Sequence, residues 1–364
     1  MTELAIIYGD ELLSYDFGPG HPLRQIRVKM AMELMEDLGL LAQGGVRVVP
    51  PRPAKEGEIL LFHERSYVEY VKMRSKEGRG LLDHGDTPAF KGCFEASVLV
   101  VGATLKAVEE ALRGGARFSA NLAGGLHHAH PNRASGFCIF NDAAIALAYL
   151  LTEGFDRLAY IDVDAHHGDG VMYGFYSDGR ILDVDFHEDG RYLFPGTGSV
   201  DEIGRGEGRG LKVNIPLPPS SGDDVFVEAF RRLVPKLLAK FKPEYIILQC
   251  GADGYVGDPL AHLSYTTHAY EYAVRELAKW SERLCEGRLT LLGGGGYSYE
   301  NAARVWSLAC CILAGYEEGV TRLKDASPTT SPPEIRGLIK ANLDKLERML
   351  SDPSRGERGK NPFK

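Results

Sequence analysis

The segment Tyr160-Ile-Asp-Val-Asp-Ala-His-His-Gly-Asp169 carries acidic and imidazole side chains at alternating positions. If the segment is a strand, Asp162, Asp164 and His166 project from one face, because successive side chains of a strand point to opposite faces. Two carboxylates buried side by side are costly unless a cation lies between them. The spacing therefore predicts a metal site, and a solvated strand end with a hydrogen-bonded histidine is the alternative.

A further ligand for such a metal is available from a second strand. The apolar run Tyr245-Ile-Ile-Leu-Gln-Cys-Gly-Ala-Asp253 ends in an acid. Ligands of open α/β sheets bind beyond the carboxyl ends of the strands, so we expect Asp253 to meet Asp164 and His166. Two carboxylates and one imidazole leave a coordination position for water, as in a catalytic zinc site. Taken alone, Asp253 is more typical of a helix cap.

Two adjacent histidines follow a glycine pair in Gly124-Gly-Leu-His127-His128-Ala-His130-Pro, which predicts a loop. A surface loop with incidental histidines is the alternative. Once Asp164 and His166 are assigned to the metal, Asp162 and Asp169 remain. A carboxylate behind each imidazole would orient it and tune its basicity.

The third chemical signal is Leu291-Leu-Gly-Gly-Gly-Gly-Tyr297. A phosphate-binding loop is the rival interpretation, but no Lys-Ser/Thr follows the glycines and no G-x-G-x-x-G leads into a helix. Glycines permit close backbone approach. We expect them to position Tyr297 over the site, where its hydroxyl can donate to a substrate carbonyl.

Apolar strands alternate with helical patterns, which favours an α/β fold: a single three-layer domain with a mostly parallel sheet, helices on both faces and the active site at the strand C-terminal ends. The expected strands are Leu4–Tyr8, Val46–Val49, Arg157–Asp164, Ile181–His187, Tyr245–Cys250 and Leu289–Leu292. The expected helices are 24–38, 93–113, 141–151, 223–241, 266–285 and 299–314.

The composition shifts after Gly315, which predicts one domain over 1–315 and a C-terminal helical extension and tail over 316–364. The stretch Asp325–Pro333 has the composition of a linker or extended loop. An amphipathic helix is expected from Ile335 to Leu350, and the end of the chain after it is expected to fray.

The composition is that of a globular protein, with 44% hydrophobic and 25% charged residues among 364. A net charge of −8 argues against direct nucleic-acid binding, which needs a basic face. The six cysteines contain no CxxC pair and predict free thiols of a reducing compartment. The start MTELAIIYGDELL lacks a signal-peptide pattern, and no apolar run approaches a membrane span, so a cytoplasmic protein without membrane association is predicted.

Taken together, these motifs resemble the histone deacetylase family, which includes bacterial acetoin-utilization proteins and acetylpolyamine amidohydrolases and has the arginase/deacetylase fold. The matching stretches occur in the family's order over roughly residues 5–315, and they are GGLHHAHP, GFCIFNDAA, YIDVDAHHGDGV, FPGTG, QCGAD and LGGGGY.

The resemblance implies a role for each matching residue. Asp164, His166 and Asp253 would bind zinc, although iron(II) also suits such ligands. His128, backed by Asp169, would be general base and then acid, while His127, backed by Asp162, would stabilise charge and Tyr297 would polarise the acyl carbonyl. The implied substrate contacts are a tunnel of Phe137 and Phe194, the Gly136 carbonyl, the rim residue Asp86 and the inner-channel residue Arg27.

Two positions depart from the pattern of better-known relatives. Asp185 stands where they usually have a serine that helps bind a structural potassium ion, which the resemblance places near Asp162, Asp164, His166 and Asp185. Leu260 stands where polyamine-selective relatives tend to have a glutamate. Leu260 therefore favours acyl-lysine over acetylpolyamine substrates.

The sequence predicts a zinc-dependent deacylase that converts an acyl amine, most readily acyl-lysine, to a carboxylate and a free amine. Alternatives are an acetylpolyamine or other small-molecule amidohydrolase, a binuclear ureohydrolase, a nucleotide-binding protein and a catalytically silent acyl-group sensor. The acyl chain, the choice of protein or small-molecule substrate and the oligomeric state stay open.

Overall fold

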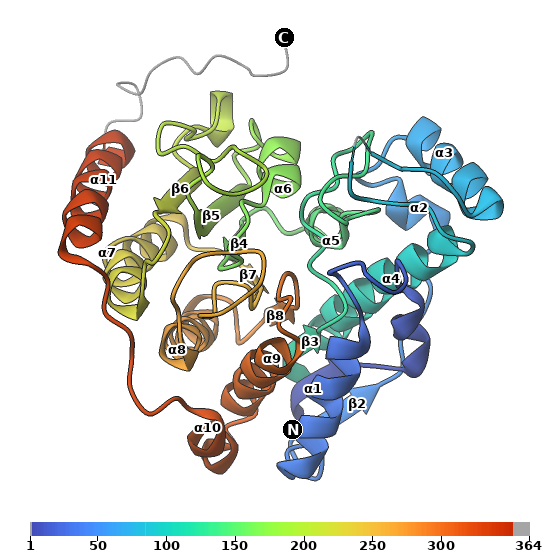
Figure 1. Ribbon diagram of the computed structural model, residues 1–364, viewed down its shortest axis with the longest axis horizontal. Coiled ribbons are helices and arrows are strands. Elements are labelled where there is room, and N and C mark those ends of the chain that lie inside the picture. The colour runs from blue at the N-terminus through green and yellow to red at the C-terminus, as the bar shows by residue number, and fades with distance from the viewer. Residues whose placement is uncertain (1, 84, 352–364) are drawn as a thin grey trace.

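One parallel sheet forms the centre of the molecule in the computed structural model, which describes residues 2–83 and 85–351 (Figure 1). Within these residues the sheet has eight strands in the order β2-β1-β3-β8-β7-β4-β5-β6. Every pairing is parallel. The strands are β1 Thr2–Ile7, β2 Val46–Val49, β3 Ala116–Asn121, β4 Leu158–Asp162, β5 Ile181–Glu188, β6 Lys212–Leu217, β7 Tyr245–Gln249 and β8 Leu289–Leu292.

Helices cover both faces of this sheet, which makes the three layers that the sequence predicts. On one face α1, α9, α8 and α7 pack in succession, and α4 and α5 lie on the other with α6 beside α5 (Figure 1). The helices are α1 Ile26–Asp37, α2 Glu56–Ile59, α3 Arg65–Glu77, α4 Cys93–Leu112, α5 Asp142–Thr152, α6 Asp169–Gly174, α7 Asp223–Phe241, α8 Thr267–Leu284, α9 Tyr299–Leu313, α10 Glu317–Leu323 and α11 Pro333–Ser351.

The central strands are buried over their whole length because helices cover both of their faces. All residues of β4, β5 and β7 are buried, including the polar Asp183, Asp185 and His187 of β5. A strand buried on both sides reads as a largely apolar run, and such runs predicted β1, β4, β7 and β8 to within a few residues. The shorter edge strand β2 and the partly polar β5 were also predicted.

One boundary differs from the expectation in a way that matters for the site. β4 ends at Asp162, not at Asp164. The backbone N–H of Asp164 donates to Oδ1 of Asp162, and that of His166 donates to Oδ1 of Asp164, so a turn begins here. Asp164 and His166 therefore lie on the loop that follows the strand, and strand alternation does not account for their direction.

The C-terminal extension packs against the rest of the molecule. Ile339, Leu343 and Leu346 of α11 are buried in the same apolar core as the sheet and its helices. Arg232 of α7 forms ion pairs with Asp344 and Glu347 of α11. The end of the chain, residues 352–364, lies outside the described residues, and so does the fraying expected there.

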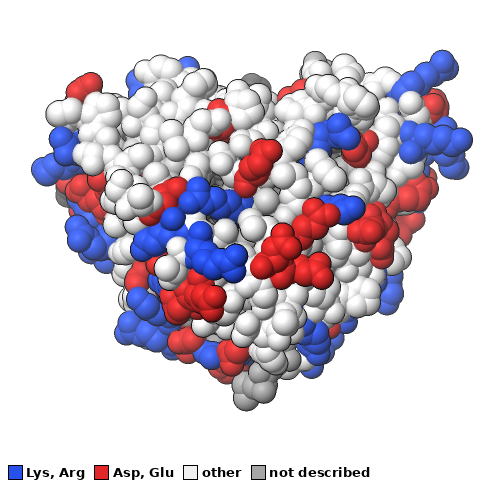
Figure 2. Space-filling view, turned by 60° about the horizontal axis from the view of Figure 1, so that its bottom comes forward, with Lys and Arg blue, Asp and Glu red and all other residues white. Residues whose placement is uncertain are grey.

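Within the described residues, no helix combines the length and the apolar character needed to cross a membrane. All six cysteines are buried free thiols. On the face shown in Figure 2, Lys and Arg side chains gather next to Asp and Glu side chains, so positive and negative charge are interspersed there.

Candidate active site

Four neighbouring strands of the sheet deliver the candidate residues to one place. β3, β8, β7 and β4 are adjacent in that order, and all four run in the same direction. The histidine loop follows β3, the glycine loop with Tyr297 follows β8, Asp253 follows β7, and Asp164 and His166 follow β4. The carboxyl ends of parallel strands share one edge, so these loops converge there.

Asp164, His166 and Asp253 form the cluster best suited to a metal. One ligand atom from each lies within 4.8 Å of the others, and all three residues are buried. Nδ1 of His166 is 2.7 Å from Oδ2 of Asp253 and 3.2 Å from Oδ1 of Asp164. The backbone supports both carboxylates, because Ala165 N–H donates to Asp253 and Gly295 N–H donates to Asp164.

The charge of this cluster also fits a divalent cation. Burial and the neighbouring charge of Asp164 raise the pKa of Asp253 to about 7, because two carboxylates in a dry site resist full ionisation. Bound zinc would relieve this repulsion, and two oxygen donors with one imidazole nitrogen are ligands that zinc accepts. The donor set thus fits the metal that the sequence predicts.

The two adjacent histidines form a pair in which each ring has its own carboxylate. Nδ1 of His127 is 2.8 Å from Oδ2 of Asp162, and Nδ1 of His128 is 2.7 Å from Oδ1 of Asp169. The two Nε2 atoms are 3.1 Å apart, so they face each other across a short gap. This is the pairing of imidazole and carboxylate that the sequence predicts.

A proton on one Nε2 atom disfavours a proton on the other. Burial lowers the pKa of His127, but the charges of Asp162 and Asp164 outweigh it and raise that pKa to about 10. Burial and the positive charge of His127 lower the pKa of His128 to about 4. His128 is therefore neutral near pH 7, with its Nε2 able to accept a proton.

Tyr297 reaches the cluster from the glycine loop. Its ring packs edge-to-face with His166 and Phe137, with centroids 6.1 and 6.0 Å away. Burial and the charges of Asp253 and Asp164 raise its pKa well above the usual value, so its hydroxyl stays protonated as a donor. Its backbone N–H donates to Oδ2 of Asp258 at 2.7 Å.

Gly136, Phe137 and Phe194 lie against the base. The Phe194 ring is edge-on to His128 with centroids 5.0 Å apart, and it is 42% exposed, which suits the mouth of a channel. A Cβ on Gly136 would lie 2.5 Å from Cδ2 of His128 and 2.7 Å from Phe194. Only glycine permits this approach, and Gly136 also has a positive φ of 52°.

The other predicted substrate-contacting residues lie at different depths. Arg27 is fully buried, so it is not a surface helix residue; its guanidinium donates to the Gly296 carbonyl and lies over Trp306. Asp86 is half-buried. Its neighbour Thr87 joins this loop to the segment of Phe137, because Thr87 Oγ1 accepts a hydrogen bond from Phe137 N–H. Leu260 is partly buried, and its backbone N–H donates to the same Asp258 that holds Tyr297.

The place where the resemblance implies a structural potassium ion is crowded with donors from the chain itself. Oδ1 of Asp185 lies 2.7 Å from His187 Nδ1, and its Oδ2 accepts from Gly168 N–H at 2.7 Å. Asp162 accepts from Tyr160 and from Asp164 N–H in addition to His127. The side-chain oxygens of both aspartates therefore already have partners.

Three residues that organise the site were given no role from the sequence. Asn141 donates to the carbonyls of His127 and Ala129, and Asp142 accepts from Gly125 N–H and Leu126 N–H. His130 contacts Asp169. Asn141 and Asp142 are the polar pair inside GFCIFNDAA. Their position at the start of a helix, within an otherwise apolar run, is the sequence feature that could have indicated their role.

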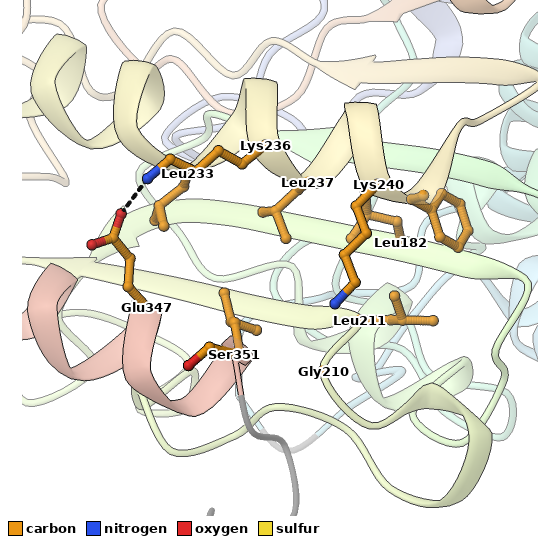
Figure 3. A pocket seen from close by; sticks show the side chains of 11 residues that line it. Leu182, Gly210, Leu211, Leu233, Lys236, Leu237, Lys240, Glu347 and Ser351 are labelled. Atoms are coloured by element: carbon orange, nitrogen blue, oxygen red, sulfur yellow. Dashed lines mark hydrogen bonds and ion pairs between the residues drawn. The ribbon is translucent and has the colours of Figure 1, made fainter.

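A sizeable cavity lies away from these residues. It has a volume of about 570 Å³ and opens between α7, α11 and the starts of β5 and β6 (Figure 3). Leu182 and Leu211, which line it, stand at the amino ends of strands, opposite to the edge that carries Asp164. Size alone therefore does not identify the active site in this molecule.

Comparison with known proteins agrees with this geometry. A family model for the histone deacetylase domain matches residues 21–313. Acetoin utilization protein AcuC of Bacillus subtilis (strain 168) is 40% identical over 327 residues, which cover 88% of this chain and 84% of that protein. AcuC of Staphylococcus xylosus is 35% identical over 363 residues, covering 96% and 93%.

Solved structures show the same similarity in three dimensions. The crystal structure of an HDAC homolog from Aquifex aeolicus aligns with a TM-score of 0.82 and 30% identity, covering 94% of this chain and 99% of that one. An HDAC homolog complexed with SAHA aligns equally well, with TM-score 0.82, 30% identity and coverage of 95% and 100%. These matches confirm the predicted arginase/deacetylase fold, and the chain belongs to the histone deacetylase family, with the acetoin-utilization type among its relatives.

Proposed function

We propose that the protein is a zinc-dependent deacylase that hydrolyses the amide of an N-acetyl or related acyl amine, with acyl-lysine as its substrate. The observation that carries the proposal is the buried cluster of Asp164, His166 and Asp253 beside the His127–His128 pair and Tyr297. A metal site, a proton acceptor and a hydroxyl donor together are what amide hydrolysis requires.

Asp164, His166 and Asp253 would hold the metal, with iron(II) as the second candidate. When bound, zinc supplies a Lewis acid that polarises the acyl carbonyl and lowers the pKa of water. The residues of the chain would do the rest. Tyr297 would donate its hydroxyl proton in a hydrogen bond to the carbonyl oxygen as negative charge develops there.

His128 would move the proton. Its neutral Nε2 accepts a proton from the attacking water and then returns it to the leaving amine nitrogen. Asp169 holds Nδ1–H of His128, which keeps Nε2 free of hydrogen. His127, kept charged by Asp162, would stabilise the negative charge that forms beside it.

The remaining residues would place the substrate. Phe137 and Phe194 would flank its alkyl chain, and the Gly136 carbonyl would accept from its amide N–H. Asp86 at the rim would accept hydrogen bonds from the backbone of a peptide substrate, and Arg27 would bind the released carboxylate. Leu260 offers no charge to attract the far amine of a polyamine, so acetylpolyamines are the second substrate candidate.

The other parts of the proposal concern the whole chain. We place the protein in the cytoplasm, acting on a small or protein-borne acyl amine without direct nucleic-acid or membrane contact. The deacetylase domain would span 1–315, with 316–364 as its extension. A potassium ion beside Asp162, Asp164, His166 and Asp185 would have to share oxygens that already accept hydrogen bonds, so we expect weak occupancy.

The test is release of carboxylate and amine from acetyl-lysine peptides, longer acyl-lysines and acetylated polyamines, using metal-stripped protein with and without added zinc. Zinc-dependent turnover with acyl-lysine ranked first is expected. Turnover of polyamines alone would favour the second substrate candidate. Binding of acyl amines without turnover of any of them, at one zinc per chain, would instead support the acyl-group sensor.

A further inference from the structure

Asp169 serves two imidazoles. Its Oδ1 is 2.7 Å from Nδ1 of His128, and its Oδ2 is 3.1 Å from Nε2 of His130. Burial raises the pKa of Asp169, but the hydrogen bonds from His128 and His130 outweigh it and hold that pKa well below the usual range. An ionised carboxylate can only accept, so both rings must donate to it.

His130 is held in place from its other side. It is 5% exposed, and its ring stacks on Tyr173 at 15° with centroids 6.5 Å apart. The Tyr173 hydroxyl donates to Glu202, whose other oxygen accepts from Gly198 N–H at 3.0 Å and Ser199 N–H at 2.8 Å. A buried ring with a stacked face and a polar partner has its orientation fixed.

These contacts form one chain of groups from the base outward: His128, Asp169, His130, Tyr173 and Glu202. The chain ends at the loop of Gly198, four residues after Phe194. The base and the segment that carries a tunnel residue are therefore supported by the same buried network.

Building on the proposed function, we propose that His130 is a positioning residue for the reaction, which keeps the Asp169 carboxylate oriented toward Nδ1 of His128. The competing explanation is that His130 only fills space under Tyr173. The two differ in one respect: filling space needs a ring, whereas positioning needs a donor at the place of Nε2.

The expected direction follows from the charges around the pair. Without the His130 donor, Oδ2 of Asp169 is buried with an unmet acceptor, and the carboxylate attracts the proton on His128 more strongly. The hydrogen bond from Nδ1–H of His128 to Asp169 should therefore strengthen. Among the described residues, His127 and His166 also face His128, and His63 and Tyr173 also face His130.

Two variants separate the explanations. His130→Phe keeps a planar ring against Tyr173 but lacks the donor, and His130→Gln places an amide N–H near the position of Nε2. We expect His130→Phe to lower kcat about 10- to 100-fold, as for other groups that orient an imidazole, with KM little changed. His130→Gln should restore kcat toward the parent value.

The same question has a readout that does not depend on turnover. In ¹⁵N-histidine-labelled, zinc-loaded protein, His128 Nδ1–H should give a downfield proton resonance, assigned by its absence from His128→Ala. That resonance should shift in His130→Phe and return in His130→Gln. Equal kcat and an equal His128 resonance in folded His130→Phe and the parent would overturn the inference. An inactive parent with the predicted shifts would instead count against the proposed function alone.

Discussion

At the scale of single residues, each proposed catalytic residue is accompanied by an acidic residue that holds it by a hydrogen bond. Each imidazole of the His127–His128 pair has a carboxylate behind it, and Tyr297 is tied by its backbone to Asp258. The second member of each pair fixes where a proton or a hydroxyl points before substrate arrives. Substitutions that keep the shape of a side chain but remove one polar atom should therefore reduce the rate without unfolding the protein.

Tyr297→Phe removes the hydroxyl that is proposed to bind the developing negative charge. We expect kcat to fall by about two to three orders of magnitude, as for removal of one oxyanion donor. Steady-state kinetics on an acetyl-lysine substrate measures this. Tyr316→Phe, which loses a hydroxyl bonded to the Leu38 carbonyl, is the control and should keep its rate. Full activity in Tyr297→Phe would exclude the role.

Asp86 should make substrate binding depend on pH. Burial and the nearby Asp83 raise its pKa to about 6. Below that pH the carboxyl is protonated and loses acceptor capacity for substrate N–H groups, so KM for a peptide substrate should fall as pH rises through about 6. Asp86→Asn should raise KM and abolish this dependence of KM on pH. A profile of KM against pH that is unchanged in Asp86→Asn would contradict the assignment.

At the scale of elements, the loops after β8 and β7 must approach closely to complete the metal site. A Cβ on Gly295 would lie 2.0 Å from Oδ2 of Asp253 and 2.9 Å from Oδ2 of Asp164. Gly295 N–H also donates to Asp164. The glycine loop is thus part of the wall that holds both carboxylates.

Gly295→Ala should therefore weaken zinc binding by at least about tenfold, the lower range for groups that orient metal ligands. Competition with a chromogenic chelator gives the affinity. Gly57→Ala is the matched control, since a Cβ there meets nothing within 4 Å. Parent-like zinc affinity in Gly295→Ala would mean that the loop yields and does not shape the site.

The helices and strands that could be predicted are those whose apolar side chains recur regularly along the sequence. β3 and β6 were missed because buried polar residues interrupt them. Ser119 of β3 pairs with Thr290, and Lys212 of β6 donates to the carbonyl of Ile181. α3 was missed because its sequence is largely polar and only Tyr67, Val68, Val71 and Ser75 are buried. These partners lie far along the chain, so a local pattern could not reveal them.

The site itself was predicted more completely than its support. Carboxylates and histidines next to strand ends are visible in the sequence, and Asp164, His166 and Asp253 do meet. The contacts of Asp142 with Gly125 N–H and of Asp258 with Tyr297 N–H join segments distant in the sequence. They depend on loop conformations that neither spacing nor periodicity determines.

At the scale of the whole molecule, the metal should contribute to stability. Without the metal, two carboxylates are buried together at the carboxyl edge of the sheet. A ligand that binds only the native state raises the free energy of unfolding by about 2.7 kcal/mol when its free concentration is 100 times Kd. Zinc added to the metal-stripped protein should raise Tm by roughly 3 to 4 °C. Asp253→Ala should lose this response, and an equal rise in that variant would place the zinc elsewhere.

One metal ion, held by Asp164, His166 and Asp253, is proposed to make this chain a deacylase. The most direct measurement is a titration of metal-stripped protein with zinc while acetate release from an acetyl-lysine peptide is followed. We expect no acetate release without metal, and a rate of release that increases linearly with added zinc and stops increasing at one equivalent per chain. Full release without metal, or an increase that continues to two equivalents, would contradict the proposal.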